Sequence, residues 1–283
     1  MAQLLEGKPI AEKIKEGIRV EVQALKNRPV LASIVVGENA GALAYVKSQA
    51  KTAEGLGIDY QLQMLDVQTS EKVLLDFIGK LNRDIAVNGI IIQMPLPPQI
   101  DYKKISQFIL PEKDVEGMHP ANIGKIVFGQ AKILPCTPAG VMELLGATGV
   151  NLRGKEVVIV GHSEIVGKPL ALLLLEKFAT VSVCHIGTSE AKKLEEHVAR
   201  AEILIVAVGR AGLIKGSWIR DGAIVIDVGI NRVDGKIVGD VEFEAAEKKA
   251  SYITPVPGGV GPLTVTMLMR NLVEAVKLQQ HGA

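Results

Sequence analysis

The sequence predicts an α/β protein of two domains, each with a parallel sheet covered by helices, and three observations lead to this prediction. Apolar runs of strand length alternate with amphipathic stretches of helical period from end to end. The length of 283 residues suits two domains. Residues 161–169 place a glycine turn between an apolar strand and a helix start, which is typical of a Rossmann-like dinucleotide-binding domain.

The first domain is expected over residues 1–138. Its predicted helices lie at residues 14–25, 42–56 and 71–81, and its predicted strands at residues 30–36, 58–65 and 89–94. Gly57 is a C-cap signal for the second of these helices, and the prolines of residues 95–98 stop the last strand.

The second domain is expected over residues 139–263, because Pro135 and Pro138 bracket a short connector before it. Strands are predicted at residues 157–160, 180–184, 203–208 and 223–228, and helices at residues 167–177 and 190–200. A last helix is predicted near residues 264–278, and periodicity alone leaves open which domain it packs against.

Composition excludes several classes of protein. The 32 Lys and Arg nearly balance 31 Asp and Glu, and only one Trp, four Tyr and five Phe are present, so no nucleic-acid partner is expected. Cys136 and Cys184 follow no metal-ligand or redox spacing, so no metal is expected. No secretory leader and no membrane-spanning stretch is recognised, which favours a cytoplasmic location and no membrane contact.

The sharpest motif follows the strand at residues 157–160. Gly161, His162 and Ser163 open a turn of spacing G-x-S-x-x-x-G that leads into a helix, where free N–H groups and the helix dipole favour a phosphate. The spacing differs from the standard G-x-G-x-x-G, and a tight strand-to-helix turn without a ligand explains it about as well.

Three further groups are candidates for a site. Gly258, Gly259 and Pro262 lie in a glycine-rich run before the last helix, which fits either a ligand loop or a plain connector. Tyr45 shares a helix face with Ala42 and Gln49, and such a face more often packs than binds. Polar residues also follow strand ends, where ligands bind in open α/β sheets: Gln93, Asp114 and Glu116. For the acidic pair, Asp114 and Glu116, a solvated loop is the simpler explanation.

Taken in order, these motifs resemble the methylenetetrahydrofolate dehydrogenase/cyclohydrolases of one-carbon metabolism, and the resemblance covers essentially the whole chain. It rests on Tyr45 and on the following segments: residues 93–97, 111–117 with Asn122 and Gly124, 135–138, 161–169, 179–185, 226–231, 239–241 and 254–264.

The resemblance implies two α/β domains facing a cleft, with residues 264–283 returning to complete the first domain, and a homodimer. It implies catalytic roles for Tyr45, Gln49, Gln93 and Glu116. It implies a tetrahydrofolate substrate held by Tyr45, Gln93, Pro95, Leu96, Asp114, Glu116, Gly258, Gly259 and Pro262. It implies NAD or NADP bound at Gly161, His162, Ser163, His185, Ile186, Val208, Gly209 and Ile230.

Three positions depart from the family pattern. Gln49 stands where Tyr-x-x-x-Lys has its lysine, Glu116 replaces the second Asp of Lys-Asp-Val-Asp-Gly, and Ala42 replaces a serine. An ammonium can donate a proton as water adds to the methenyl carbon, whereas an amide can only hydrogen-bond. We therefore expect hydride transfer to be kept and hydrolysis to be weak, although drift with both activities kept is the alternative.

Two other functions remain open from the sequence. A catalytically silent nucleotide-binding module could keep the same fold. Another two-domain dehydrogenase, of the shikimate or amino-acid type, would share the second domain, but residues 93–97 and 254–264 argue against it.

The sequence favours NAD over NADP, with dual use left open. Family members that use NADP commonly carry Arg after the first glycine and Cys-His-Ser followed by Arg or Lys, whereas here His162 follows Gly161, and Ile186 and Gly187 follow His185. No acidic residue follows this strand to hold ribose hydroxyls, as in many NAD enzymes. The missing cation weighs more, because a phosphate dianion beside an apolar side chain loses hydration without compensation.

Overall fold

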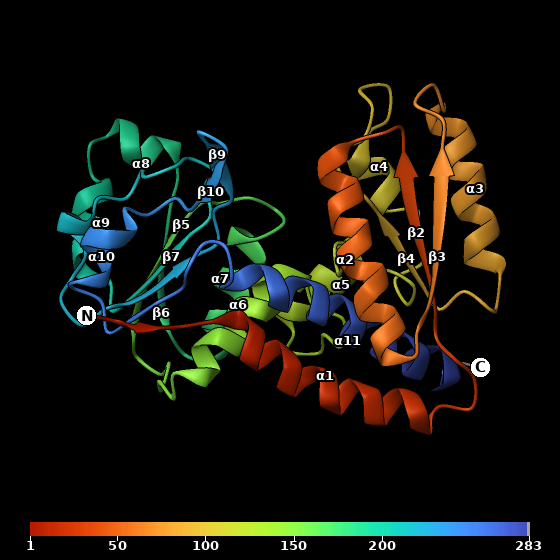
Figure 1. The fold of residues 1–283 in the computed structure, drawn as a ribbon, viewed down its shortest axis with the longest axis horizontal. Helices are drawn as coiled ribbons and strands as arrows, with labels where there is room; N and C mark the ends of the chain where they lie inside the picture. Colours follow the sequence, from red (N-terminus) through yellow and green to blue (C-terminus); the bar gives the residue numbers. More distant parts are fainter. Residues whose placement is uncertain (282–283) are drawn as a thin grey trace. The chain divides into compact units, whose positions relative to one another are not determined.

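The computed structural model describes residues 1–281, and the chain divides into two compact units (Figure 1). Unit 1 contains residues 1–12 and 137–264. Unit 2 contains residues 13–136 and the chain from Val265 onward. Each unit has its own sheet, as the alternating pattern of strands and helices predicted.

Unit 2 is built on a three-stranded parallel sheet of order β3-β2-β4. Its strands are β2 (Val30–Val36), β3 (Asp59–Leu65) and β4 (Gly89–Ile92), and Ala32 of β2 pairs with Gln61 of β3 and Ile90 of β4. Its helices include α2 (Ala40–Leu56), α3 (Glu71–Arg83), α4 (Tyr102–Ser106) and α5 (Pro120–Val127). Helices α1 (Gly7–Ala24) and α11 (Val260–His281) also contribute residues to it.

Helix α2 carries two of the predicted site residues, and local signals set its ends. The side chain of Asn39 accepts hydrogen bonds from the N–H groups of Gly41 and Ala42 at the first turn. Gly57 closes the helix in the left-handed conformation, φ 77°, as the sequence predicted.

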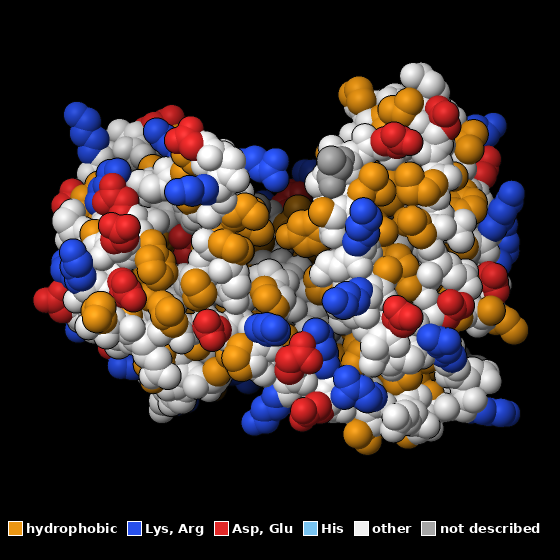
Figure 2. Space-filling view, viewed as in Figure 1, with side chains coloured by type: hydrophobic (Ala, Val, Ile, Leu, Met, Phe, Trp, Pro, Cys, Tyr) orange, Lys and Arg blue, Asp and Glu red, His pale blue; other side chains and the backbone are white. Residues whose placement is uncertain are grey.

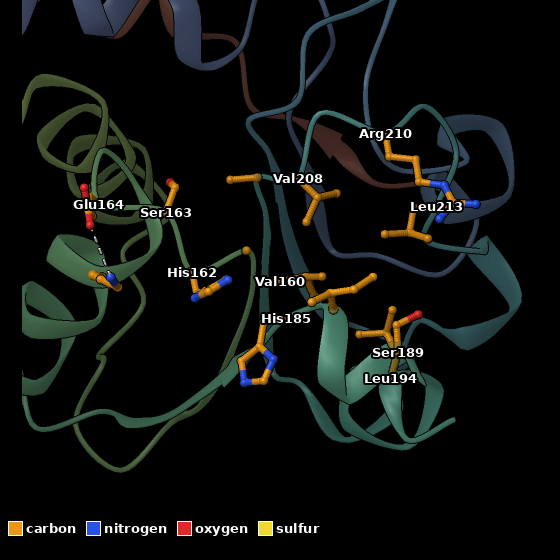
Figure 3. A pocket seen from close by; sticks show the side chains of 14 residues that line it. Val160, His162, Ser163, Glu164, His185, Ser189, Leu194, Val208, Arg210 and Leu213 are labelled. Carbon is orange, nitrogen blue, oxygen red and sulfur yellow. Dashed lines mark ion pairs between the residues drawn. The ribbon is translucent and has the colours of Figure 1, made fainter. Parts of the chain in front are cut away.

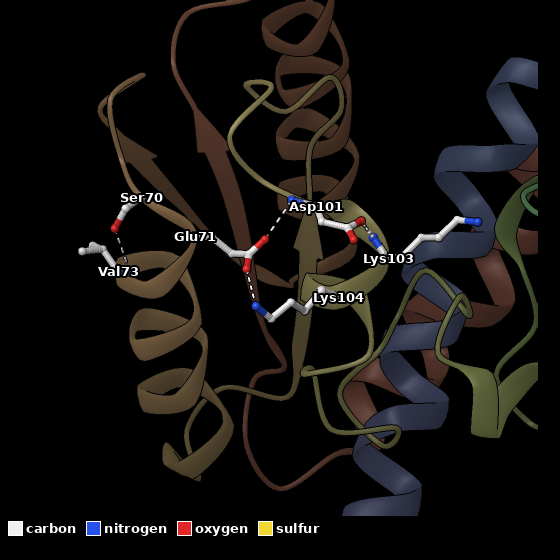
Figure 4. Close-up of polar contacts among 6 residues, drawn as sticks. All are labelled: Ser70, Glu71, Val73, Asp101, Lys103 and Lys104. Carbon is white, nitrogen blue, oxygen red and sulfur yellow. Dashed lines mark hydrogen bonds and ion pairs between the residues drawn. The ribbon is translucent and has the colours of Figure 1, made fainter.

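The two faces of the unit 2 sheet differ in character. Ala32, Ile34 and Ile90 point into an apolar core with α3 and α4, while alternate residues such as Ser33 point to the opposite face. Glu71 begins α3 and ties it to α4 by accepting from the Asp101 N–H and pairing with Lys104 (Figure 4). At the sheet edge, β3 exposes Leu62 and Met64, and Figure 2 shows apolar side chains gathered over this part of unit 2.

Unit 1 contains a six-stranded parallel sheet of order β1-β11-β8-β7-β5-β6. The strands are β1 (Gln3–Leu4), β5 (Glu156–Val160), β6 (Thr180–Cys184), β7 (Ile203–Val206), β8 (Ile224–Asp227) and β11 (Tyr252–Ile253). The helices are α6 (Cys136–Ala147), α7 (Gly167–Glu176), α8 (Ile186–Glu190), α9 (Leu194–Arg200) and α10 (Phe243–Glu247), with a short 3-10 turn η1 (Gly216–Trp218) and a hairpin β9–β10 (Asn231–Val233, Lys236–Val238).

The structure differs from the sequence prediction at several places. The helix predicted at residues 14–25 begins at Gly7, and helices α4, α5 and α6 were not predicted. Residues 1–12 were assigned to the first domain, but Gln3 pairs with Tyr252, so β1 extends the sheet of unit 1. The helix predicted at residues 190–200 begins only at Leu194, because Lys192 adopts φ 57° between α8, which ends at Glu190, and α9. The last helix begins at Val260, several residues before its predicted start. In the described chain, no helix is both long and apolar enough to cross a bilayer.

Candidate active site

A cavity of unit 1 has a volume of about 520 Å³ and lies at the carboxyl ends of β5, β6 and β7 (Figure 3). Gly161 follows β5 with φ 123°, and a Cβ there would lie 2.2 Å from the carbonyl oxygen of Ala207. A Cβ on Gly167 would lie 2.0 Å from the carbonyl oxygen of Gly161. Only glycine fits this turn, which leaves the start of α7 open to a phosphate.

Six of the eight predicted cofactor residues line this cavity. They are Gly161, His162, Ser163, His185, Ile186 and Val208. Gly209 and Ile230 are not among its lining residues within the described chain, although Gly209 directly follows Val208. The sequence analysis missed the other lining residues, which come from the end of β5 and the turn after it, from α7, α8 and α9, and from the loop after β7: Val160, Glu164, Lys168, Ser189, Leu194, Ala207, Arg210 and Leu213.

The polar groups around the cavity come from separate elements. The rings of His162 and His185 lie 5.1 Å apart, and the Nδ1 atom of His185 caps α8 by accepting from the Gly187 N–H. Figure 3 shows Arg210 beside Leu213, on the other side of Val208 from His162. Arg210 is therefore a cationic side chain at the cavity that the sequence analysis had not considered.

Two buried aspartates hold the loops at this end of the sheet. The Asp240 carboxylate accepts hydrogen bonds from the N–H groups of Val208, Gly209 and Arg210 at 2.7 to 3.0 Å. Asp227 accepts from the N–H groups of Gly229, Asp240 and Val241. Burial raises the pKa of Asp227 to about 6, while these hydrogen bonds act in the opposite direction. Together they fix the backbone of the loop after β7.

The glycine-rich run before α11 is held within unit 1. Gly258 has φ 115° and accepts a 2.9 Å hydrogen bond from the Gly7 N–H. A Cβ on Gly259 would lie 2.7 Å from that of Thr254, so only glycine fits there. The Gly259 N–H donates to the Pro255 carbonyl, and Pro262 lies half-buried in the first turn of α11.

In unit 2, Gln49 and Gln93 lie at the centre of a neutral polar cluster. Their side chains are only 5% and 6% exposed, and Gln93 Nε2 donates to Gln49 Oε1 at 2.7 Å and to Ser33 Oγ at 3.0 Å. The Tyr60 hydroxyl donates to the same oxygen of Gln49 at 2.9 Å. Sequence analysis missed Ser33 and Tyr60, because a polar residue within a strand run carries no signal of its partner.

Tyr45 lies one turn before Gln49 on the same face of α2 and is 44% exposed. It therefore presents an aromatic face to solvent beside the buried amides. Pro95 and Leu96 follow β4 directly after Gln93; Pro95 is exposed and Leu96 half-buried.

A second polar group of unit 2 is acidic. The Tyr102 hydroxyl donates to Glu116 Oε2 at 3.1 Å. Burial, reinforced by the nearby charge of Asp114, raises the pKa of Glu116 to about 7. The Asp114 carboxylate accepts from the N–H groups of Gly117 and His119 and from Asn122 Nδ2, so it shapes the loop that carries Glu116.

These groups define what unit 2 can do chemically. The glutamine cluster offers hydrogen bonds but no group that gives or takes a proton near neutral pH. Glu116 can exchange a proton near neutral pH. Among the residues that the structure describes, no three His, Cys, Asp or Glu side chains gather as a metal site would require.

Comparisons with known proteins cover nearly the full length of the chain. The tetrahydrofolate dehydrogenase/cyclohydrolase catalytic-domain model matches residues 5–116, and the NAD(P)-binding-domain model of the same name matches residues 135–280. The bifunctional protein FolD of Bacillus pumilus is 51% identical over 280 residues, which is 98% of each chain.

Solved structures agree with this match. The bifunctional FolD methylenetetrahydrofolate dehydrogenase/cyclohydrolase of Campylobacter jejuni superposes with a TM-score of 0.95 at 46% identity, covering 99% of this chain and 100% of that one. A FolD methylenetetrahydrofolate dehydrogenase-cyclohydrolase of Trypanosoma brucei, solved with NADP and an inhibitor, gives 0.92 at 37% identity, covering 99% and 98%.

Proposed function

This chain belongs to the tetrahydrofolate dehydrogenase/cyclohydrolase family, and on that premise we propose that it oxidises 5,10-methylenetetrahydrofolate to the 5,10-methenyl form with a nicotinamide dinucleotide. The observation that carries the proposal is the cavity of unit 1, whose Gly161 turn leaves α7 open to a phosphate, in a chain matched by both family models. A silent module with the same fold is not favoured by relatives named as bifunctional enzymes.

We propose that the folate is held mainly by residues of unit 2. The exposed ring of Tyr45 offers a stacking face, and the Gln49–Gln93 pair offers hydrogen bonds beside it. Asp114, Glu116, Pro95 and Leu96 complete this set in unit 2. Gly258, Gly259 and Pro262 of unit 1 are proposed as further substrate contacts from the family resemblance.

In the dehydrogenase step the protein mainly positions the reactants. Bound nicotinamide supplies the acceptor for the hydride, so the chain needs no acid or base at this step. Orientation supplies most of the rate, because the donor and acceptor carbons must be held close and aligned. The neutral Gln49–Gln93 pair also avoids placing a cation beside a carbon that becomes positively charged.

We propose that hydrolysis of the methenyl product is weak in this chain. Gln49 occupies the position where the family pattern has lysine, and its carbonyl oxygen already accepts two hydrogen bonds. General acid–base help is typically worth about 10²–10⁴-fold, so its loss separates the two activities. Exposed Lys47 and Lys51 lie about 200° away from Gln49 around α2 and do not replace the missing ammonium.

We propose NAD as the preferred cofactor. The segment after β6 presents Ile186, which is exposed and apolar, where a 2′-phosphate would need a donor. Arg210 belongs to the loop after β7, next to Leu213, and we assign it to the adenine side of the cavity. Gly209 and Ile230 remain proposed cofactor contacts through the loops that Asp240 and Asp227 hold.

We further propose a homodimer, as the family resemblance implies, and a cytoplasmic location. Cys136 and Cys184 are both buried as free thiols, which suits a reducing compartment. We propose the domain limits expected from the sequence, 1–138 with 264–283 and 139–263, with one change. Residues 1–12 belong to unit 1 and are moved to the second domain.

One assay tests the proposed function. Purified protein is mixed with 5,10-methylenetetrahydrofolate and oxidised NAD or NADP, and the absorbances of methenyltetrahydrofolate and of reduced nicotinamide are followed. Turnover with kcat/KM higher for NAD is expected. No signal with either cofactor would favour the silent module, and a tenfold preference for NADP at pH 8 would contradict the cofactor proposal.

A further inference from the structure

The side chains of Gln49, Gln93, Ser33 and Tyr60 are joined by three hydrogen bonds and form the Gln49 cluster. Gln93 Nε2 donates to Gln49 Oε1 and to Ser33 Oγ, and the Tyr60 hydroxyl donates to Gln49 Oε1. The Gln49 cluster therefore joins one residue each from β2, β3, the end of β4 and α2.

The register of the sheet explains why these residues meet. Leu31 pairs with Tyr60 and Ser33 with Ile91, so Ser33, Tyr60 and the residue two positions after Ile91, Gln93, point to the same face. This is the face opposite the apolar core of α3 and α4. Gln49 on α2 reaches these three side chains.

The hydrogen bonds within the Gln49 cluster use one end of each amide. Gln93 Nε2 donates both of its hydrogens inside the cluster, and Gln49 Oε1 accepts two bonds. Within the described chain, Gln49 Nε2 and Gln93 Oε1 have no hydrogen-bond partner, and no fully buried side-chain nitrogen or oxygen lacks one. Both atoms are therefore at the surface of the cluster, where a ligand can reach them.

We propose that Tyr60 is a positioning residue that holds the Gln49 amide with its oxygen turned into the Gln49 cluster and its nitrogen turned toward the folate. The pair then presents a donor, Gln49 Nε2, beside an acceptor, Gln93 Oε1, to an edge of the substrate that carries an acceptor beside a donor. This inference rests on the proposed function and adds to it the residue that fixes the orientation of the amide.

The Tyr60 hydroxyl suits this role because it remains a donor. Burial raises the pKa of Tyr60 to about 12, so the hydroxyl stays protonated throughout the range in which the enzyme would be assayed. Ser33, which is fully buried, accepts a hydrogen bond from Gln93 Nε2 at the other end of the cluster.

Tyr60 also fills the space that a longer side chain at position 49 would need. Lysine is one atom longer than glutamine, and Tyr60 Oη and Gln93 Nε2 already lie 2.9 and 2.7 Å from the end of Gln49. We therefore expect Gln49→Lys alone to recover only part of the hydrolysis rate, and removal of the Tyr60 ring to increase that recovery.

A double-mutant cycle tests the positioning role. Tyr60→Phe keeps the aromatic ring and removes the hydroxyl that donates to Gln49. We expect kcat/KM for methylenetetrahydrofolate to fall about 3- to 10-fold, the size of one lost hydrogen bond. The KM for the dinucleotide should not change. In a Gln49→Ala background the same substitution should change kcat/KM less than twofold, because Tyr60 then has no amide to orient.

The control is Tyr252→Phe on β11 of unit 1, which should leave the folate parameters unchanged. An equal loss from Tyr60→Phe in both backgrounds, or no loss in the unsubstituted chain, would overturn the inference and leave the dehydrogenase proposal standing. A chain that never turns over methylenetetrahydrofolate would overturn both.

A second comparison does not depend on loss of function. Methenyltetrahydrofolate hydrolysis by Gln49→Lys is compared with that by Gln49→Lys combined with Tyr60→Ala, each corrected for the buffer-catalysed rate. We expect the double variant to hydrolyse at least threefold faster than the single one. Equal or slower hydrolysis, with thermal unfolding showing that both variants are folded, would show that Tyr60 does not restrict position 49.

Discussion

Gln93 donates a 2.7 Å hydrogen bond from its side-chain nitrogen to the carbonyl oxygen of Gln49. Both side chains are buried, so this pair of amides forms a neutral hydrogen bond shielded from water at the position where the family pattern has an ammonium. The contact changes what the site can do, because an amide offers hydrogen bonds but cannot transfer a proton near neutral pH.

Gln49→Lys should increase methenyltetrahydrofolate hydrolysis by about tenfold or more, because it restores a group that can donate a proton as water adds. The rate is measured after correction for buffer catalysis. Lys47→Gln, on the exposed side of α2, is the matched control and should have no effect. Robust hydrolysis in the unsubstituted chain that Gln49→Ala leaves unchanged would contradict the assignment.

Tyr45→Ala should raise the KM for methylenetetrahydrofolate by about 5- to 30-fold, because the substrate loses an aromatic stacking face worth about 1–2 kcal/mol. Tyr45→Phe keeps that face and should change KM much less. If Tyr45→Ala leaves both turnover and folate affinity unchanged, the folate does not bind at this face of α2.

Glu116→Gln should make the protein more stable at pH 8 than the unsubstituted chain. The pKa of Glu116 is raised from 4.5 to about 7, so the folded state favours the protonated carboxyl. The stability that this preference provides is complete below about pH 4.5 and is lost as the pH rises toward 7. Glutamine avoids that loss, and we expect a gain of about 1–3 kcal/mol at pH 8 relative to pH 5.

Urea unfolding at the two pH values measures this difference. Exposed Glu190→Gln serves as the control and should shift stability equally at both. If Glu116→Gln has the same effect at pH 5 and pH 8, the carboxyl does not titrate between them in the folded protein.

Asp240→Asn should weaken dinucleotide binding. The carboxylate accepts hydrogen bonds from the N–H groups of Val208, Gly209 and Arg210, and an amide nitrogen in place of one oxygen would face a donor. We expect the KM for the dinucleotide to rise at least tenfold and the protein to lose about 2–4 kcal/mol of stability. Asp221→Asn, at an exposed surface position, should change neither quantity.

His162→Arg should shift cofactor use toward NADP by about tenfold in the ratio of kcat/KM values, because a guanidinium can bind a phosphate bidentately. Arg210→Ala is the informative companion variant. A selective loss of NADP turnover in Arg210→Ala would show that this side chain supplies the cation and would overturn its assignment to adenine.

The sequence was sufficient to predict the fold class, most strands and the glycine turn after β5. Those features depend on period and on residues whose backbone preferences are local, such as Gly57 and Gly161. The pairing of Gln3 with Tyr252 could not be read in this way, because two short strands some 250 residues apart carry no local signal of each other.

The family resemblance predicted the residues of the proposed site by their type and order, and six of the eight proposed cofactor residues line one cavity. Their environments required the tertiary structure. The raised pKa of Glu116 comes from burial and from Asp114, and the orientation of Gln49 comes from Ser33, Tyr60 and Gln93. By itself the sequence determined which groups are present; the fold decided which of them are buried and hydrogen-bonded together, because desolvation and hydrogen-bond geometry depend on residues far apart along the chain.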